Sequence, residues 1–230
     1  MYKRQDYSQV ELRVMAHLSG DASLISALNN GEDIHTFTAK NIFNVDNDDM
    51  VLPEMRRIAK IVNFGIMYGA GPFRLSQELD IPFGEAKQIK DAYFEKYQGI
   101  EQYIENSKLQ IKETKSVETL LGRKRAVWDS DSQNKIRRDA AERMAINMPI
   151  QGTAAEMIKL AMIKIHRQMN KENLKSKLIM QIHDELLLEV HQDEIDYISK
   201  MVIEHMRNAM KLDVPIEIDF GIGPSWYEAH

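Results

Sequence analysis

Residues 177–190 read KLIMQIHDELLLEV, and this stretch decides the fold of the later part of the chain. Two apolar runs, each long enough for a strand, flank His183, Asp184 and Glu185. Three polar residues between such runs predict a tight hairpin turn. Aspartate is a common turn residue, so the turn alone would explain one acid. A simple turn does not need three ionisable groups, which makes this hairpin a candidate functional site.

Strand and helix patterns extend outward from the hairpin. A further strand is predicted over 215–223, and a helix over about 192–211 precedes it. Apolar residues at helical spacing, with start and stop signals, predict helices earlier in the chain, over 8–29, 53–68, 82–97, 99–115, 133–147 (ending near Pro149) and 153–170. Residues 117–128 alternate and turn at Gly122, which predicts a small hairpin. Helices followed by a small, mostly antiparallel sheet form an α+β arrangement.

Composition narrows the classes of protein. The 230 residues are 43% hydrophobic, enough for one sizeable core or two small lobes. No run approaches ~18 apolar residues, so no membrane-spanning helix is expected. The lack of cysteine excludes disulfides and thiolate metal sites and favours a reducing, intracellular compartment. A net charge of −5 argues weakly against a nucleic-acid partner, but basic residues cluster in 56–60, 122–125 and 135–138.

One predicted helix carries a stripe of four residues at intervals of four positions: Arg56, Lys60, Phe64 and Tyr68. Residues at this spacing share a helix face, so the stripe offers two cations for phosphates and two rings for stacking. Gly65 lies inside the helix at a cost of about 1 kcal/mol relative to Ala, which indicates that something approaches the backbone closely. The alternative is an amphipathic helix whose long cationic side chains cover apolar surface.

Three motifs together resemble the polymerase motifs of the family A DNA polymerases, the bacterial DNA polymerase I type. They are DYSQVELR (6–13), the Arg56-xxx-Lys60-xxx-Phe64-xxx-Tyr68-Gly69 pattern and His183-Asp184-Glu185, in the order and approximate spacing of the family. The resemblance runs from Asp6 to the end of the chain. It includes DIHT (33–36), AAERMAINMPIQGTAAEMIKLAM (140–162) and GIGPSWYEAH (221–230).

The resemblance implies template-directed DNA synthesis, in which a primer 3′ hydroxyl attacks a dNTP and pyrophosphate leaves. Two Mg²⁺ ions, held by Asp6, Asp184 and the backbone carbonyl of Tyr7, would stabilise the attacking and leaving oxygens. Glu185 is implied as a nearby helper rather than a required ligand. The same resemblance implies that Lys60 is a catalytic residue together with these acids.

The resemblance also implies how the substrates are held. The dNTP contacts it implies are Gln9, Glu11, His35, Arg56, Lys60, Phe64 and Tyr68. Within this set Glu11 resembles the steric gate that excludes a ribose 2′ hydroxyl. The implied contacts to primer-template DNA are Arg143, Asn147, Gln151, Gln181 and His183, with Pro149 expected to interrupt the helix between Asn147 and Gln151. Donors in the minor groove can test base-pair geometry without reading sequence.

The family pattern further implies a partial polymerase. Residues 1–30 and 131–230 correspond to a palm, a small antiparallel sheet with helices, and residues 31–130 to helical fingers. Thumb, proofreading and 5′-nuclease domains are expected to be missing, because MYKRQ before Asp6 is too polar for the apolar strand expected there. A truncated chain is therefore expected to be marginally stable, to bind dNTP and Mg²⁺ weakly and to extend primers poorly. It is expected to be a monomer without membrane association, in the bacterial cytoplasm at the nucleoid or in an organelle.

Three other functions stay open at this point. A metal-dependent nuclease or phosphoesterase could use the same acids, although it has no evident need for the Arg56-to-Tyr68 stripe. A non-enzymatic nucleotide- or DNA-binding module could retain the site without using it. A single-subunit RNA polymerase shares the metal acids but is disfavoured by Glu11, because it must accept the 2′ hydroxyl.

Overall fold

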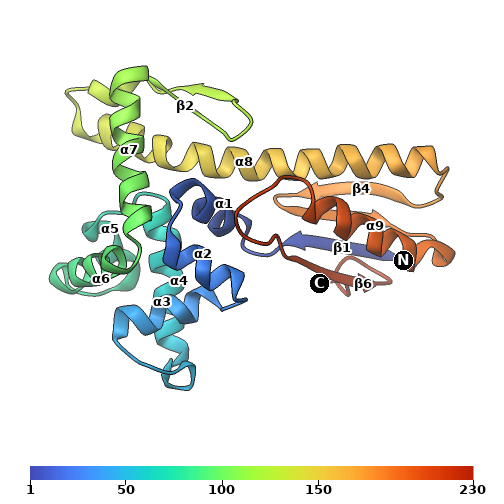
Figure 1. The fold of residues 1–230 in the computed structure, drawn as a ribbon, viewed down its shortest axis with the longest axis horizontal. Helices are drawn as coiled ribbons and strands as arrows, with labels where there is room; N and C mark the ends of the chain where they lie inside the picture. The colour runs from blue at the N-terminus through green and yellow to red at the C-terminus, as the bar shows by residue number, and fades with distance from the viewer. Residues whose placement is uncertain (230) are drawn as a thin grey trace. The chain divides into compact units, whose positions relative to one another are not determined.

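The computed structural model describes residues 1–229, which divide into two compact units (Figure 1). The first unit combines Met1–Val14 with the chain from Gln151 onward, and the second is Met15–Ile150. The boundaries fall inside two helices, α1 (Val10–Ser19) and α8 (Lys135–Lys171). The palm and fingers boundaries at residues 30 and 130 stay a prediction from the sequence.

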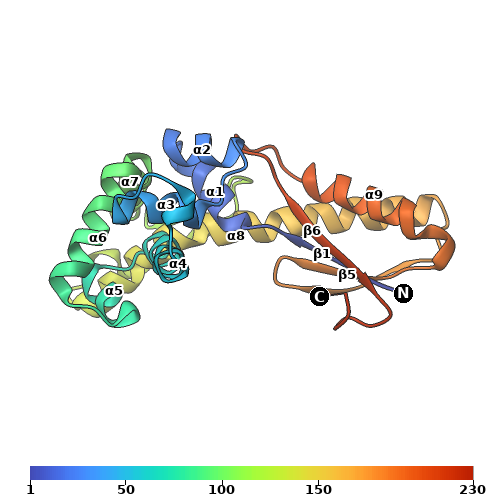
Figure 2. The same cartoon turned by 90° about the horizontal axis from the view of Figure 1, so that it is seen from below.

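The first unit is built on a four-stranded antiparallel sheet with the order β4-β5-β1-β6. Its strands are β1 (Tyr2–Tyr7), β4 (Lys177–Ile182), β5 (Glu185–Glu189) and β6 (Ile218–Gly223). Figure 2 shows β1, β5 and β6 side by side. The predicted hairpin is present, and the predicted α+β class with a small antiparallel sheet is confirmed. The last strand begins at Ile218 rather than at residue 215.

Alternate residues of strand β1 face the buried interior of the unit and the partly exposed opposite side of the sheet. Lys3, Gln5 and Tyr7 are buried, and the Tyr7 hydroxyl donates a hydrogen bond to the Met206 carbonyl at 2.9 Å. Met206 belongs to α9 (Ile195–Arg207), which packs against β1 and β6. Because side chains alternate along a strand, Arg4 and Asp6 share the opposite face.

The expectation that MYKRQ cannot supply a strand before Asp6 is wrong. Backbone pairing with β5 and β6 holds this segment as β1, although two polar side chains are buried. Among the described residues, Lys3 Nζ and both amide atoms of Gln5 have no hydrogen-bond partner. Burial lowers the pKa of Lys3 to about 8, and its ammonium lies 4.3 Å from the centroid of the Phe220 ring. The strand therefore forms at an energetic cost, since unpaired buried polar groups are unfavourable.

Helix α8 corrects the prediction that Pro149 ends one helix before another begins. The helix runs unbroken from Lys135 to Lys171, with Pro149 inside it. A proline removes one helical hydrogen bond and crowds the preceding turn. The Tyr103 hydroxyl donates to the Ile146 carbonyl at 2.9 Å, giving a carbonyl in that turn an additional partner. Asn147 and Gln151 thus lie on one continuous helix, rather than on two helices separated by a break.

Helices make up most of the second unit. They are α2 (Ala22–Asn29), α3 (Ile34–Phe43), α4 (Pro53–Met67), α5 (Pro72–Leu79), α6 (Phe83–Lys96) and α7 (Gln98–Thr114). A hairpin of β2 (Ser116–Glu118) and β3 (Lys124–Ala126) follows, and short 3₁₀ turns lie at Asp48–Met50 and Trp128–Asp131, with a third at Gln192–Glu194 in the first unit. None of the helices in the described part of the chain is long and apolar enough to cross a bilayer.

Two glycines set the ends and contacts of these helices. The single helix predicted over 8–29 is divided at Gly20, whose φ of +61° favours glycine. The close approach to the backbone predicted at Gly65 is present, and the group that approaches is a side chain of the protein itself. A Cβ added there would lie 3.1 Å from Leu75 Cδ2 of α5. Gly65 therefore lets α5 approach α4.

Candidate active site

Acidic side chains meet on one face of the sheet in the first unit. Asp6 pairs across the ladder with Glu185 on one side and Asp219 on the other. Two residues, His183 and Asp184, connect β4 to β5, so Glu185 opens β5 rather than lying in the turn. The backbone N–H of Tyr7 donates to the Asp184 carbonyl at 3.4 Å. The structure thus brings Asp6, Tyr7, Asp184 and Glu185 together, as the motifs predict.

The Asp6 carboxylate lies in a surplus of negative charge. Burial and the nearby charges of Asp184, Glu185 and Asp219 raise its pKa to about 6, against the opposing influence of Arg4. Its Oδ2 atom accepts from Arg4 at 2.8 Å. Its Oδ1 atom is buried and has no hydrogen-bond partner among the described residues. A further cation at Oδ1 would satisfy both the atom and the charge.

Glu185 is held on both of its oxygens. Oε2 accepts from Arg4 Nε at 2.8 Å, and Oε1 accepts from the Trp226 indole at 2.9 Å. This anchoring fits a supporting role better than a ligand role for Glu185. Sequence reasoning missed Arg4 and Trp226. The i, i+2 spacing of Arg4 and Asp6 on a strand was the signal that could have placed Arg4 beside the acid.

The donor set fits a divalent cation that prefers oxygen ligands. No group of three or more His, Cys, Asp or Glu side chains able to hold a metal ion occurs among residues 1–229. The predicted set is smaller, with two carboxylates and one backbone carbonyl. Mg²⁺ is often bound through one or two carboxylates together with substrate phosphates. The unpaired Oδ1 of Asp6 beside the charge of Asp184 satisfies this requirement.

The other predicted residues of the first unit lie on or beside α1, α8 and the β4–β5 hairpin. Gln9 has a φ of +52° just before α1, and Glu11 lies in the first turn of that helix. Gln181 donates from Nε2 to the His183 carbonyl at 2.8 Å, which braces the hairpin. Gln151 is exposed on α8.

In the second unit, helix α4 displays the predicted stripe. Arg56 and Lys60 are exposed, and the rings of Phe64 and Tyr68 are half-buried. These two rings stack with centroids 6.2 Å apart and planes at 26°. Lys60 has no hydrogen-bond or ion-pair partner within the part of the chain that the structure describes. The stripe therefore offers a free ammonium next to a stacked aromatic pair.

Unlike Lys60, Arg56 is engaged in an ion pair. Its Nε and a terminal nitrogen donate to the two oxygens of Asp33 at 3.1 and 2.7 Å. Burial would raise the pKa of Asp33, but the bonds from Arg56 and from the Thr36 backbone N–H outweigh it and lower that pKa to about 2. Asp33 also caps α3 through the Thr36 N–H at 2.7 Å. A phosphate that uses the Arg56 fork must displace Asp33, a partner that sequence reasoning missed.

His35 is buried and uncharged at neutral pH. Burial lowers its pKa to about 4, with Arg56 and Lys60 lowering it further and Asp33 opposing them. Asn63 Oδ1 accepts from Thr38 at 3.1 Å, so the amide nitrogen of Asn63 faces His35 Nδ1 at 3.0 Å. Nδ1 is then the acceptor and Nε2 carries the proton. If His35 contacts a phosphate, it does so as a neutral N–H donor.

His35 makes the stability of the chain depend on pH. The folded state takes up the His35 proton only near pH 4, whereas the unfolded chain takes it up near the ordinary value of 6.5. His35 is therefore expected to contribute a fall of about 2 kcal/mol in the free energy of unfolding as the pH drops from 6.5 to 4, whereas Asp6, whose pKa the fold raises to about 6, contributes in the opposite direction. Urea unfolding of wild type and His35→Gln across this window measures the difference in slope.

The His35→Gln variant lacks this contribution, and its slope reports the remaining groups: burial lowers the pKa of His205, which acts with the same sign as His35, and the raised pKa of Asp6 acts with the opposite sign. Equal slopes for wild type and variant would show that His35 is not kept neutral by the fold.

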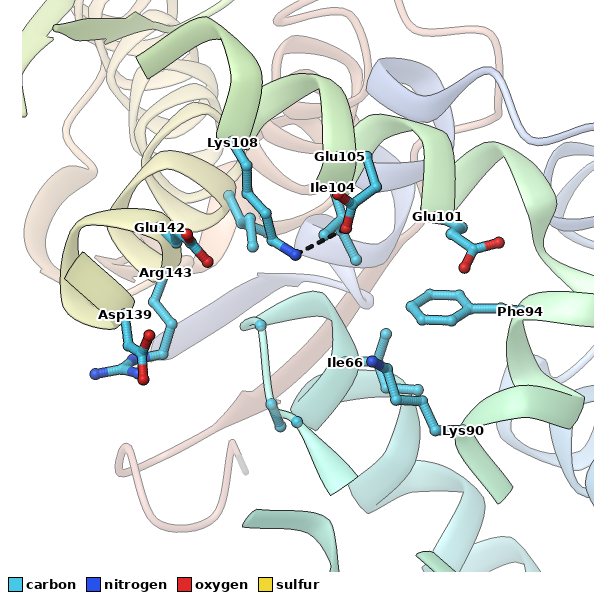
Figure 3. Close-up of a pocket in the computed structure, with 14 residues that line it drawn as sticks. Ile66, Lys90, Phe94, Glu101, Ile104, Glu105, Lys108, Asp139, Glu142 and Arg143 are labelled. Atoms are coloured by element: carbon cyan, nitrogen blue, oxygen red, sulfur yellow. Dashed lines mark hydrogen bonds and ion pairs between the residues drawn. The ribbon is translucent and has the colours of Figure 1, made fainter. Parts of the chain in front are cut away.

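Helix α8 carries the predicted DNA contacts of the second unit. Arg143 and Asn147 are one turn apart, and the Asn147 Oδ1 atom is buried without a hydrogen-bond partner among the described residues. Arg143 lines a cavity of about 280 Å³. Figure 3 shows Arg143 and Asp139 on one side of this cavity and Lys90 and Phe94 on another.

The cavity does not have the charge of a phosphate site. Its cations are outnumbered by its carboxylates, which are Glu101, Glu105, Asp139 and Glu142. Lys108 is already paired with Glu105 at 2.8 Å. Arg143 is the residue of this wall that the sequence connects with DNA, and the other charged residues of the lining carry a surplus of negative charge.

Comparison with known proteins gives the family. The sequence profile described as DNA polymerase family A matches residues 2–228. The DNA polymerase I of Bacillus subtilis (strain 168) is 47% identical over 224 residues, which is 97% of this chain and 25% of that protein. The thermostable DNA polymerase I of Thermus aquaticus is 45% identical over 224 residues, 97% of this chain and 27% of that protein. The chain thus spans about a quarter of the length of these curated relatives.

A solved structure is similar over nearly the whole chain. It is the POL domain of Pol1 from M. smegmatis, in complex with DNA primer-template and dNTP. The TM-score is 0.96 at 44% sequence identity, and the match covers 99% of this chain and 40% of that one.

Proposed function

Since this chain belongs to DNA polymerase family A, we propose that it carries out template-directed DNA synthesis, adding dNTPs to a primer 3′ hydroxyl with release of pyrophosphate. The observation that carries the proposal is the buried, unpaired Oδ1 of Asp6 beside Asp184. Nucleotidyl transfer needs a cation at such a site, because charge develops on the attacking and leaving oxygens. The exposed Lys60 and the Phe64–Tyr68 ring pair supply what a nucleotide substrate additionally requires.

Family A DNA polymerases generally use divalent metal ions. We propose that Asp6, Asp184 and the Tyr7 carbonyl hold two Mg²⁺ ions, which when bound would stabilise the developing charge on both oxygens. Glu185, fixed by Arg4 and Trp226, supports the position of these ligands without joining them.

The protein's own side chains orient and charge-balance the triphosphate. Lys60 contributes a point charge to its phosphates, and Arg56 a planar fork once it leaves Asp33. His35 adds a neutral N–H donor. Phe64 lies against the sugar and base, while Tyr68 stacks where the template base lies. Glu11, next to Gln9 at the start of α1, fills the space that a ribose 2′ hydroxyl would need.

Primer-template DNA and dNTPs are the proposed partners. Donors that meet the minor groove can contact acceptors present at every base pair, so they test pair geometry regardless of sequence. We assign this role to Arg143, Asn147, Gln151, Gln181 and His183. We further propose that the sheet-bearing first unit is the palm and the helical second unit the fingers, that the protein acts as a monomer, and that it works in the cytoplasm at the bacterial nucleoid.

We also propose that residues 1–230, taken alone, extend primers slowly. The proposal is supported by the length of these residues, because they correspond to 40% of the POL-domain chain of M. smegmatis Pol1. Fewer groups are then available to hold the duplex, so the primer end dissociates before many nucleotides are added.

The proposal is tested by incubating an excess of the 230-residue chain with a labelled primer-template, Mg²⁺ and each dNTP in turn. Single-turnover conditions allow one slow addition to be seen even when processive synthesis fails. The proposal requires that the complementary dNTP extends the primer by one nucleotide in preference to the other three. Shortening of the primer in the absence of dNTP would favour the nuclease reading instead, and binding without any addition would favour the inactive binding module.

A further inference from the structure

Arg4 bridges two acids of the candidate active site. Its terminal nitrogen donates to Asp6 Oδ2 and its Nε donates to Glu185 Oε2, both at 2.8 Å. The guanidinium is largely enclosed, with 18% of its side chain exposed, and the Glu185 side chain is 8% exposed. Such an ion pair is screened by solvent far less than one on an open surface.

The charges around Arg4 explain why a cation is held there. Asp6 is paired across the sheet with Glu185 on one side and Asp219 on the other, and Asp184 precedes Glu185 in the chain. Arg4 is the cation that contacts both Asp6 and Glu185 within this acidic group. The guanidinium therefore provides the kind of compensation that a bound metal ion would provide, at the same carboxylate.

We propose that Arg4 is a built-in counter-ion that competes with divalent metal ions for Asp6, so that metal binding at Asp6 and Asp184 is weakened until Arg4 withdraws. The inference rests on the proposed function, because it concerns the same site. A guanidinium fixed to Asp6 Oδ2 and a divalent ion at Oδ1 of the same carboxylate would repel each other at short range.

Withdrawal of Arg4 leaves the rest of the site in place. Glu185 keeps its hydrogen bond from the Trp226 indole, and Asp6 remains within the β1 ladder. The ligands that would gain from the withdrawal are oxygen-preferring divalent cations such as Mg²⁺ and Mn²⁺.

The test is a titration of the 230-residue chain with Mn²⁺ alone, followed by electron paramagnetic resonance of the free ion, without DNA or nucleotide. Arg4→Met removes the charge and keeps most of the side-chain length. We expect it to lower the Kd for Mn²⁺ at least tenfold. Arg4→Lys keeps the charge but loses the two separate donors that bridge Asp6 and Glu185, so its Kd should lie between those of wild type and Arg4→Met.

Two further variants make the result specific. Lys177→Met, on β4 and away from the acids, changes the net charge equally and should leave the Kd within twofold. Asp184→Asn in the Arg4→Met background should abolish the added affinity. Folding of every variant is checked by circular dichroism, and Arg4→Gln replaces Arg4→Met if the latter does not fold.

An unchanged or weaker affinity in Arg4→Met and Arg4→Gln would overturn the inference and leave the polymerase proposal standing, provided that Mn²⁺ binding still depends on Asp184. Mn²⁺ affinity that does not change when Asp184 is replaced, in any variant, would overturn both the inference and the polymerase proposal. Equal gains in Arg4→Met and Lys177→Met would also overturn the inference, since they would show a general charge effect.

Discussion

Asp184→Asn is expected to lower the rate of single-nucleotide incorporation by about a thousandfold, equivalent to roughly 4 kcal/mol of activation free energy. The variant keeps the size and turn-forming ability of the side chain but removes one of the two carboxylates that fit a divalent cation. The assay is best made in a chimera in which the 224 residues of this chain that align with the B. subtilis DNA polymerase I replace their counterparts in that protein. Rapid-quench measurement with saturating dNTP reports the rate.

Asp193→Asn is the matched control for this experiment. Asp193 is an exposed acid of the same unit, 84% exposed and close to His191 at 3.4 Å, with no place in the candidate active site. The control variant should incorporate nucleotides at the wild-type rate. A loss of less than tenfold in Asp184→Asn, with the control unchanged, would contradict the assignment of Asp184 as a metal ligand.

Lys60→Met is expected to reduce incorporation efficiency, kcat/KM for dNTP, by about a hundredfold. Lys60 is exposed on α4 and has no partner among the described residues, so its charge is available to a triphosphate without first breaking an ion pair. If the ammonium acts mainly on charge that develops during transfer, kcat falls more than KM rises. Measuring both parameters at pH 7.5 separates this role from simple nucleotide binding.

Arg57→Met provides the control on the same helix. Arg57 is exposed and pairs with Glu54 one turn away, and it lies off the stripe that contains Lys60. Its loss removes the same charge from α4 and should change kcat/KM less than twofold. Equal losses in Lys60→Met and Arg57→Met would mean that α4 acts only through its overall charge.

Much of the fold could be predicted because the strongest signals are local. The KLIMQI and ELLLEV runs are apolar, of strand length and separated by polar residues, so the β4–β5 hairpin follows from pattern alone. The α4 stripe follows from helical spacing in the same way. Its predicted contents, two cations followed by two aromatic rings, lie on the helix surface as expected.

Features that depend on partners distant in the sequence could not be predicted. Strand β1 looks too polar to be a strand, and it forms because β5 and β6 pair with it from residues 179 or more positions away. Pro149 is tolerated inside α8, where Tyr103 reaches the preceding turn. Local pattern does not contain either contact.

In the candidate site, too, local motifs could be predicted and contacts between distant elements could not. The motif residues themselves were identified from the sequence, but the ion pairs that restrain two of them were not. Asp33 holds Arg56, and Arg4 holds Asp6. Asp33 caps α3 in the structure, yet nothing in the sequence around it shows that α4 brings Arg56 to it. Side chains joined across elements become visible only in the folded chain.

The most direct test of the central claim is template-directed incorporation by the chimera on four primer-templates that differ only in the template base. We predict that each template selects its complementary dNTP over the other three, and that Asp184→Asn abolishes the addition in all four cases. A folded chimera that binds primer-template but adds no nucleotide, or adds nucleotides without regard to the template base, would contradict the account.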